Sequence, residues 1–155
     1  MKKLILMLFL CLSCFSFGSW IIEGERDEFG DLRGEELVSL EKENMRGLCK
    51  ISKSDGKYLM TFFSLDYIGG KGKDNSSRIR IKIDNLEPKT FYGVLVEGGG
   101  GKLVEIKIDT KMIELLKKGT ELKVSIQKYD DSTILQKYSL SGFTKAFNEL
   151  FYKKF

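Results

Sequence analysis

The stretch RIRIKID, residues Arg78–Asp84, decides the fold because apolar and charged side chains alternate strictly along it. Its three isoleucines fall on one side of an extended chain, and the charged side chains fall on the other. This alternation is typical of an antiparallel strand that buries one face and exposes the other. The same pattern recurs at Val104–Ile108 and Leu122–Ile126. Half-buried strands are therefore predicted to supply most of the core.

Six further segments have less regular strand patterns. They are Trp20–Glu25, Glu36–Leu40, Met45–Ser52, Tyr58–Tyr67, Phe91–Val96 and Thr133–Leu140. Between them, Asp55-Gly56 and Asp130–Ser132 are typical of hairpin turns, Gly69–Ser77 of a longer polar loop, and Pro88 of a connection. Roughly nine short strands predict a mainly β fold, either an antiparallel β-sandwich or a partly closed barrel.

Two short helices interrupt this pattern. Asp109 or Thr110 can cap the interior helix, and Lys117–Gly119 can end it. Its apolar face consists of Met112, Ile113, Leu115 and Leu116.

The chain ends in a second helical pattern, which we expect to pack on the sheet. Its apolar residues stand at i, i+3, i+4, i+7 and i+8: Phe143, Ala146, Phe147, Leu150 and Phe151. Ser141 is the predicted cap of its first turn, and Lys153 and Lys154 suit its last turn. This stripe, together with Gly142 and Trp20, forms the predicted set of structural residues. Burial on a membrane or a partner is the alternative for the stripe.

The N-terminus is typical of a secretory signal. Lys2 and Lys3 precede the uncharged apolar run Leu4–Phe17, which is short for a membrane-spanning helix. Cleavage after Gly18 would remove residues 1–18 and leave one β-rich domain, residues 19–155. The alternative is lipoprotein processing at Cys14, which would attach a lipid anchor. We therefore predict an exported protein, periplasmic or at the cell surface or secreted, without a stable transmembrane span in the mature chain.

Charge is distributed unevenly along the chain. Residues 23–43 contain nine acids against three bases, although the whole chain has a net charge of +4. The two regions can neutralise each other within one fold, or they can leave a basic surface uncovered. An uncovered basic surface would favour anionic partners. Nucleic acid is not expected as a partner, because export separates the protein from it and no binding motif is present.

The sequence offers little for catalysis, and we predict that the protein is not an enzyme. The chain contains no histidine, so triads with a histidine base and histidine metal sites are excluded. Cys49 is the only cysteine left after cleavage, and it is predicted to be a small strand residue. No catalytic, cofactor-binding or metal-binding residue is predicted, and no cofactor.

Two glycine-containing segments resemble ligand loops only superficially. Glu97–Lys102 lacks the serine or threonine that follows the lysine of a phosphate-binding loop, and strand Leu103–Ile108 follows it instead of a helix. A flexible hairpin tip is predicted there. Asp27–Asp31 lacks the acid spacing of an EF-hand, so it is predicted to be a turn with a solvated acidic rim.

The two ends of the chain resemble known proteins. Trp20, "DEFGD" at Asp27–Asp31, Gly34 and the terminal "LSGFTKAFNEL" are similar to a group of small exported bacterial proteins. The stretch Leu140–Ala146 is also similar to the ending of the invasion-associated locus B family, which is made of small exported proteins with a β-sandwich-like fold. That family typically carries paired cysteines, whereas this chain would retain one. The resemblance implies a periplasmic or surface β-domain with a role in host interaction or the envelope, and it implies no catalytic residues.

Three functions remain open at this point. The first is an exported non-enzymatic β-domain that binds an envelope component or a host protein. The second is a β-barrel carrier of a small apolar ligand. Its pocket would be lined by aromatic residues: Tyr58, Phe62, Phe63, Tyr67, Phe91 and Tyr92. The third is a cryptic hydrolase with paired carboxylates or a Ser-Lys pair.

Overall fold

The computed structural model describes residues 20–26, 32–40, 42, 46–71 and 74–152. The chain forms one antiparallel sheet of nine strands and two helices. The strands are β1 (Ile21–Arg26), β2 (Leu32–Leu40), β3 (Gly47–Ser54), β4 (Lys57–Ser64), β5 (Ser76–Ile83), β6 (Lys89–Leu95), β7 (Leu103–Ile108), β8 (Glu121–Gln127) and β9 (Thr133–Ser139). The helices are α2 (Thr110–Lys118) and α3 (Phe143–Phe151). The mainly β prediction is confirmed.

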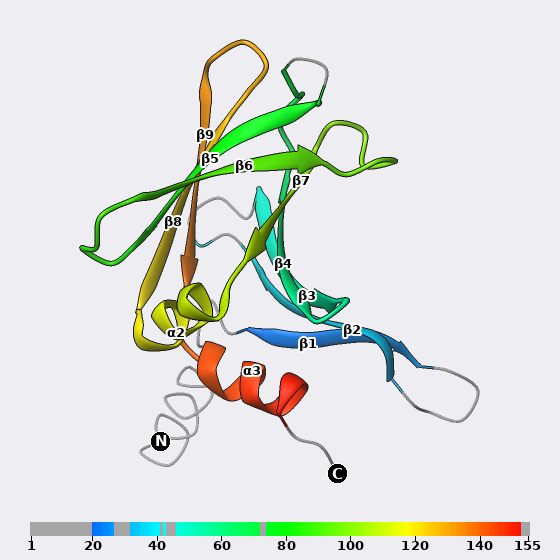
Figure 1. Cartoon of the computed structure of the whole chain (residues 1–155), viewed down its shortest axis with the longest axis vertical. Helices are drawn as coiled ribbons and strands as arrows, with labels where there is room; N and C mark the ends of the chain where they lie inside the picture. Colours follow the sequence, from blue (N-terminus) through cyan, green and yellow to red (C-terminus); the bar gives the residue numbers. More distant parts are fainter. Residues whose placement is uncertain (1–19, 27–31, 41, 43–45, 72–73, 153–155) are drawn as a thin grey trace, which may run out of the picture.

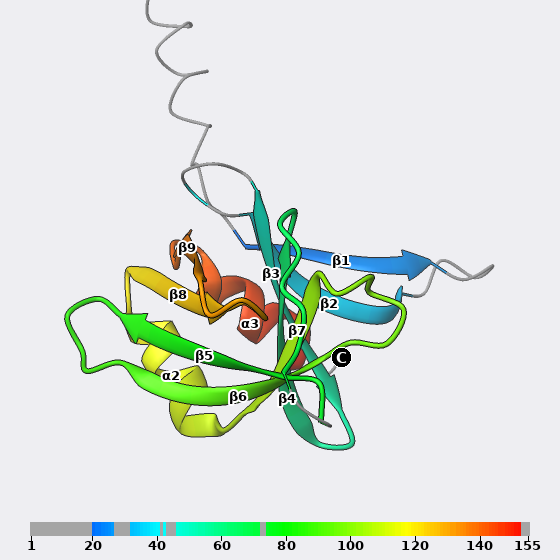
Figure 2. The ribbon, with the colours of Figure 1, turned by 90° about the horizontal axis from the view of Figure 1, so that it is seen from above.

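The sheet bends back on itself and so forms two leaves. Its strand order is β1-β2-β3-β4-β7-β6-β5-β8-β9. The first leaf contains β1 to β4 and β7, and the second contains β6, β5, β8 and β9, on opposite sides of the molecule (Figures 1 and 2). The leaves join where β6 pairs with β7 through only two residue pairs, Val94 with Glu105 and Leu95 with Val104. At this join a Cβ on Gly93 would lie 2.7 Å from side-chain atoms of Ile79 and Val104, so only glycine fits.

The two leaves meet again along a seam that is not a strand ladder. Trp20 Nε1 donates a hydrogen bond of 2.9 Å to the Ser139 carbonyl oxygen, which joins the start of β1 to the end of β9. Gln136 Nε2 donates 2.9 Å to the Phe63 carbonyl oxygen, and the Tyr138 hydroxyl donates 2.7 Å to Gln136 Oε1. Gly47 lies beneath this contact, because a Cβ there would lie 2.3 Å from Gln136 Nε2. The backbone N–H of Lys42 also donates 2.6 Å to the Lys137 carbonyl oxygen. The sheet is therefore sandwich-like, and its two leaves are joined at this seam by side chains and a backbone bond rather than by a ladder.

The inner faces of both leaves form one core. Along β5 the buried residues are Ile79, Ile81 and Ile83, and the corresponding residues of β8 are Leu122, Val124 and Ile126. The opposite leaf contributes Cys49, Ile51, Met60, Phe62, Val104 and Ile106. The alternation read from RIRIKID is thus the alternation of core and solvent.

Both helices lie at one end of the sheet (Figure 1). Asp109 caps α2, with its Oδ1 accepting 2.8 Å from the Met112 backbone N–H, as predicted. The two helices contact each other, because Thr144 Oγ1 donates 3.0 Å to the Lys117 carbonyl oxygen. On α3, Phe143, Ala146 and Phe147 are buried, and Leu150 and Phe151 are partly buried against the core. Phe147 packs 5.4 Å from the Tyr58 ring, and Trp20 packs 5.0 Å from Phe143, both between ring centroids.

The prediction that Ser141 caps α3 is wrong. The capping position is Gly142, at φ 78°, and no side chain bonds the first turn. Ser141 instead donates its own backbone N–H to Ser139 Oγ at 3.2 Å. The left-handed conformation suits glycine and redirects the chain from β9 into the helix without a side-chain cap. The C-terminal Lys153 and Lys154 lie outside the described residues.

Two strand boundaries differ from the prediction by more than two residues. β2 begins at Leu32, four residues before the predicted start, because it pairs with β1 as well as with β3. β4 ends at Ser64, where its hydroxyl accepts a hydrogen bond of 3.1 Å from the Asp66 backbone N–H and bends the chain. The Asp55-Gly56 and Asp130–Ser132 connections are hairpin turns, as predicted, with Asp55, Gly56 and Asp131 at positive φ.

Candidate functional site

Lysines from three neighbouring strands lie side by side on the outer face of the second leaf. Lys82 of β5 is paired in register with Lys123 of β8, and Lys123 is paired with Lys137 of β9. Adjacent strands are about 4.8 Å apart, and like charges directly opposite each other destabilise a sheet. The repulsion between these opposed lysines is therefore unfavourable for folding, and the Glu121 carboxylate, 3.2 Å from Lys123 Nζ, offsets part of it. We call the outer face of β6, β5, β8 and β9 the cationic face.

Two arginines extend this face along β5. Arg78 and Arg80 are exposed, and they point outward between the buried isoleucines. Within the part of the chain that the structure describes, Arg78, Arg80 and Lys82 form no ion pair. Three charges on one strand are thus not neutralised by that part of the protein.

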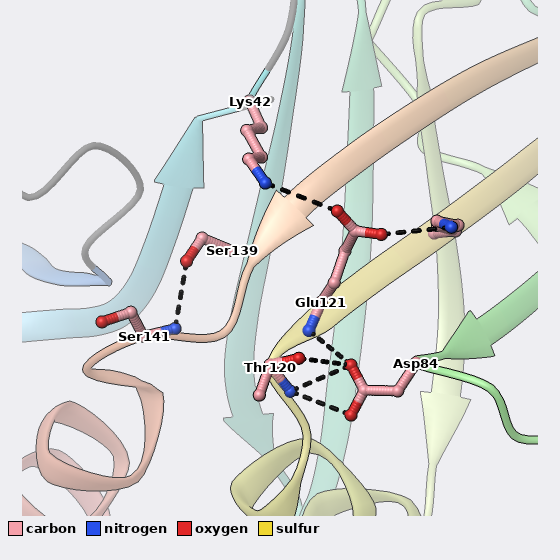
Figure 3. Close-up of polar contacts among 7 residues, drawn as sticks. Lys42, Asp84, Thr120, Glu121, Ser139 and Ser141 are labelled. Carbon is pink, nitrogen blue, oxygen red and sulfur yellow. Dashed lines mark hydrogen bonds and ion pairs between the residues drawn. The ribbon is translucent and has the colours of Figure 1, made fainter.

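Acidic side chains lie at the two ends of this face, Glu121 and Asp84 at one end and Asp131, which accepts from Gln127, at the other. Glu121 lies at the start of β8, with its carboxylate 3.2 Å from Lys123 Nζ and 3.5 Å from Lys42 Nζ (Figure 3). Lys123 and then Lys42 hold the pKa of the Glu121 carboxyl below its usual range. Glu121 is therefore shared by two lysines at the end of the face.

Asp84 fixes this end of the face. It follows β5 at φ 48°, and its carboxylate accepts from the backbone N–H groups of Thr120 and Glu121, at 3.1 and 2.8 Å, and from the Thr120 hydroxyl at 2.6 Å (Figure 3). The Thr120 hydroxyl, followed by these backbone donors, lowers the pKa of Asp84. The carboxylate therefore ties the end of β5 to the loop that leads from α2 into β8.

The cationic face is hollowed in two places. A hollow of about 220 Å³ is lined by Arg80, Lys82, Lys123, Lys137, Leu135 and Pro88, among others. Another hollow, of about 190 Å³, includes Arg78, Tyr92, Gln127 and Ser76 in its lining. In order along β5, the hollow lined by Arg78 is the first, and the hollow lined by Arg80 and Lys82 is the second. Tyr92 and Leu135 are unusually exposed for their size, at 74% and 70%. Cationic, aromatic and aliphatic groups therefore share one outer surface.

Sequence reasoning missed this site. Each strand showed its outward cations in its alternation, but the register that places Lys82, Lys123 and Lys137 side by side depends on which strands pair. Strands β5 and β8 are neighbours in the sheet, although β6, β7 and α2 lie between them in the sequence. The overall excess of basic residues after residue 43 was the available signal.

The predicted structural residues lie away from the cationic face. Trp20, Phe143, Ala146 and Phe147 are buried where the helices and the seam meet, Leu150 and Phe151 pack at their edge, and Gly142 is the exposed turn before α3.

The residues considered for catalysis show no reactive arrangement. Cys49 is fully buried in β3, and burial raises the pKa of its thiol, so a thiolate nucleophile is disfavoured. Among the described residues, no group of three or more cysteine and carboxylate side chains is placed to hold a metal ion. Glu97–Lys102 forms the turn between β6 and β7, with Gly98, Gly100 and Gly101 at positive φ. Asp27–Asp31 lies outside the described residues.

The six aromatic residues proposed to line an apolar pocket do not converge. Tyr58 and Phe62 are buried in the core, whereas Tyr67 and Tyr92 are exposed. Phe63 follows Phe62 in the same strand and so faces the opposite side of the sheet. The apolar hollow that the structure does contain, of about 270 Å³, lies between β5, the β5–β6 turn and α2.

Over the residues that the structure describes, no helix has the length and apolar character needed to cross a membrane. Residues 1–18 and Cys14, on which the export and lipidation predictions depend, lie outside that part of the chain.

Comparison with known proteins identifies the fold and the family. The crystal structure of invasion associated protein B from Bartonella henselae superposes with a TM-score of 0.62 at 16% identity, covering 87% of this chain and 93% of that one. No curated protein matches in sequence. The family model for the invasion associated locus B (IalB) protein matches residues 70–150, which is just over half of the chain and includes most of the cationic face. The chain therefore belongs to the IalB family.

Proposed function

We propose that the protein is an exported, non-enzymatic β-domain that binds an envelope component or a host protein through its cationic face. The observation that carries this proposal is the register of Lys82, Lys123 and Lys137 beside Arg78 and Arg80, which form no ion pair with the described residues. Lysines directly opposite each other on neighbouring strands destabilise a sheet. Because this arrangement does not help the protein to fold, we infer that it serves binding. The absence of histidine and the burial of the Cys49 thiol favour binding over catalysis.

A binding assay on envelope and host-surface fractions tests this proposal. The purified protein should be retained at low salt and released as ionic strength rises, because exposed charges are screened within about 10 Å at 0.1 M salt. Arg80→Glu should abolish retention, whereas Lys107→Glu, an exposed charge reversal on β7 of the other leaf, should not. Equal retention of both variants would refute binding through this face.

The proposed export has its own test. We infer processing after Gly18, so that residues 19–155 form the mature single domain at the periplasm or cell surface, with lipidation at Cys14 as the alternative. Mass spectrometry of the protein recovered from its own cells distinguishes these outcomes. A chain starting at Ser19 supports cleavage, a lipidated Cys14 supports a membrane tether, and a chain that retains residues 1–18 refutes both.

The apolar hollow favours a second candidate function, transport of a small apolar ligand. Ile81, Ile83, Met112, Leu115 and Leu86 provide almost entirely apolar walls. Native mass spectrometry of the purified protein should then detect a bound apolar molecule, and Leu115→Trp should displace it. A ligand-free mass for the parent would remove this candidate.

A further inference from the structure

The two hollows of the cationic face follow each other along β5. Arg78 lines the first hollow, and Arg80 and Lys82 line the second. Alternate residues of a strand lie about 6.6 Å apart, so cations are spaced over about 13 Å from Arg78 to Lys82. Lys123 widens the row onto β8. The site is therefore an elongated series of cationic positions rather than a pocket for one compact anion.

The first hollow adds groups that recognise more than charge. Tyr92 is the direct cross-strand neighbour of Arg78, and its ring is 74% exposed. Ser76 also lines this hollow and offers a hydroxyl. Gln127 lines it too, with its Nε2 donating 2.7 Å to Asp131 Oδ1 and its amide oxygen able to accept from a sugar hydroxyl. An exposed aromatic ring beside hydrogen-bonding groups suits the flat C–H face and the hydroxyls of a sugar ring. Arg78 can at the same time hold a carboxylate or sulfate in a bidentate manner.

We infer that the cationic face binds an acidic polysaccharide, one whose sugars carry carboxylate or sulfate groups, lying along β5. This inference rests on the proposed binding function of the same face. One sugar ring stacks on Tyr92, and anionic groups further along the chain are held by Arg80, Lys82 and Lys123. The hollows accommodate the bulk of the sugar rings between these cations.

The geometry favours this partner over three others. A flat bilayer contacts protruding groups and leaves hollows unfilled. An acidic peptide that adds a strand needs the open edge of a sheet, whereas this site lies on a face. Single-stranded nucleic acid is usually held by several stacking aromatic residues. Among the described residues of β6, β5, β8 and β9, Tyr92 is the single exposed aromatic residue.

Isothermal titration with a size-defined heparin oligosaccharide tests the inference. The parent should bind, neutral dextran should not, and binding should weaken as salt rises. Arg80→Glu should lower affinity about tenfold or more, and Tyr92→Ala should lower it about three- to tenfold, whereas Lys107→Glu should stay within about twofold. Far-UV circular dichroism of each variant verifies that the fold is retained.

Parallel titrations separate this inference from the proposed function. Phosphatidylglycerol vesicles and a single-stranded DNA oligonucleotide serve as the other anionic probes. Binding of heparin that is insensitive to Tyr92→Ala, or preference for vesicles or DNA, would overturn the polysaccharide and leave the face as a binding site. Retention on envelope fractions that is unaffected by Arg80→Glu would overturn the proposed function itself.

Discussion

The two leaves of the sheet share one core but differ in how charged side chains are arranged on their outer faces. On the first leaf, Lys50 of β3 lies 2.8 Å from Glu36 of β2, and Thr61 of β4 donates to Glu105 of β7 at 3.3 Å. On the second leaf, Lys82, Lys123 and Lys137 face one another across strands. The first arrangement pairs complementary groups, whereas the second places like charges opposite each other, which destabilises a sheet. We therefore take the second as the better guide to function.

The largest effect is expected in the core that both leaves share. Phe147 is fully buried and packs between Tyr58, Phe143 and Phe151, with Lys117 Nζ 4.9 Å from its ring. Phe147→Asp should lower the free energy of unfolding by about 3–5 kcal/mol or prevent folding, because it removes a buried ring and introduces a charge. Denaturant unfolding measures this, with the exposed neighbour Asn148→Asp as control. A Phe147→Asp protein that melts like the parent would show that α3 does not close the core.

The seam between the leaves should be the next most sensitive part. Gly47→Ala places a methyl group 2.3 Å from Gln136 Nε2 and 3.1 Å from the Tyr138 hydroxyl. We expect a loss of about 1–3 kcal/mol in the free energy of unfolding, because the seam has to open to relieve this overlap. Ser54→Ala, at the exposed end of the same strand, should change stability by less than about 0.5 kcal/mol. Equal stability of the two variants would contradict a side-chain closure of the sheet.

The Asp84 anchor of the second leaf should make stability depend on pH. Its carboxyl has a lowered pKa in the folded protein, so its contribution is present above the pKa of the unfolded chain and is lost as the pH falls through the folded value. The melting temperature of the parent should therefore drop in acid more than that of Asp84→Asn, whose side chain does not titrate. Asp55→Asn, in the β3–β4 turn, provides the matched control. If the melting temperature of Asp84→Asn fell in acid as much as that of the parent, this carboxylate would not be a source of the pH dependence.

The smallest effects should have opposite signs on the two outer faces. Lys82→Thr removes a repulsive cross-strand contact and should raise the free energy of unfolding by about 0.2–1 kcal/mol at low salt. Lys50→Thr removes the partner of Glu36 and should lower it by about 0.2–1 kcal/mol. Salt should reduce both differences. Changes of the same sign would mean that the faces do not differ electrostatically.

Local patterns predicted the strands well because alternation and turn chemistry are properties of neighbouring residues. RIRIKID became β5 with its isoleucines buried, Asp55-Gly56 became a hairpin turn, and Asp109 became the cap of α2. The helix at the C-terminus was also predicted from its apolar stripe. Its start was not, since Gly142 takes a left-handed conformation that its neighbours in sequence do not specify.

The candidate site could not be predicted in the same way, because it depends on pairing between strands distant in sequence. Nothing within Leu122–Ile126 indicates that Lys123 will lie between Lys82 and Lys137. The seam is similarly long-range, since Trp20 and Ser139 are 119 residues apart. The excess of basic residues after residue 43 indicated only that an uncovered cationic surface was one of two outcomes, the other being neutralisation by the acidic segment.

We propose above all that the second leaf keeps Arg80 and Lys82, which form no ion pair with the described residues, for binding rather than for folding. The most direct measurement compares the parent with Arg80→Gln/Lys82→Gln, recording denaturant unfolding and retention on envelope and host-surface fractions for both proteins. We predict equal or higher stability for the variant together with a loss of retention. A variant that is less stable, or that is retained as well as the parent, would contradict the claim.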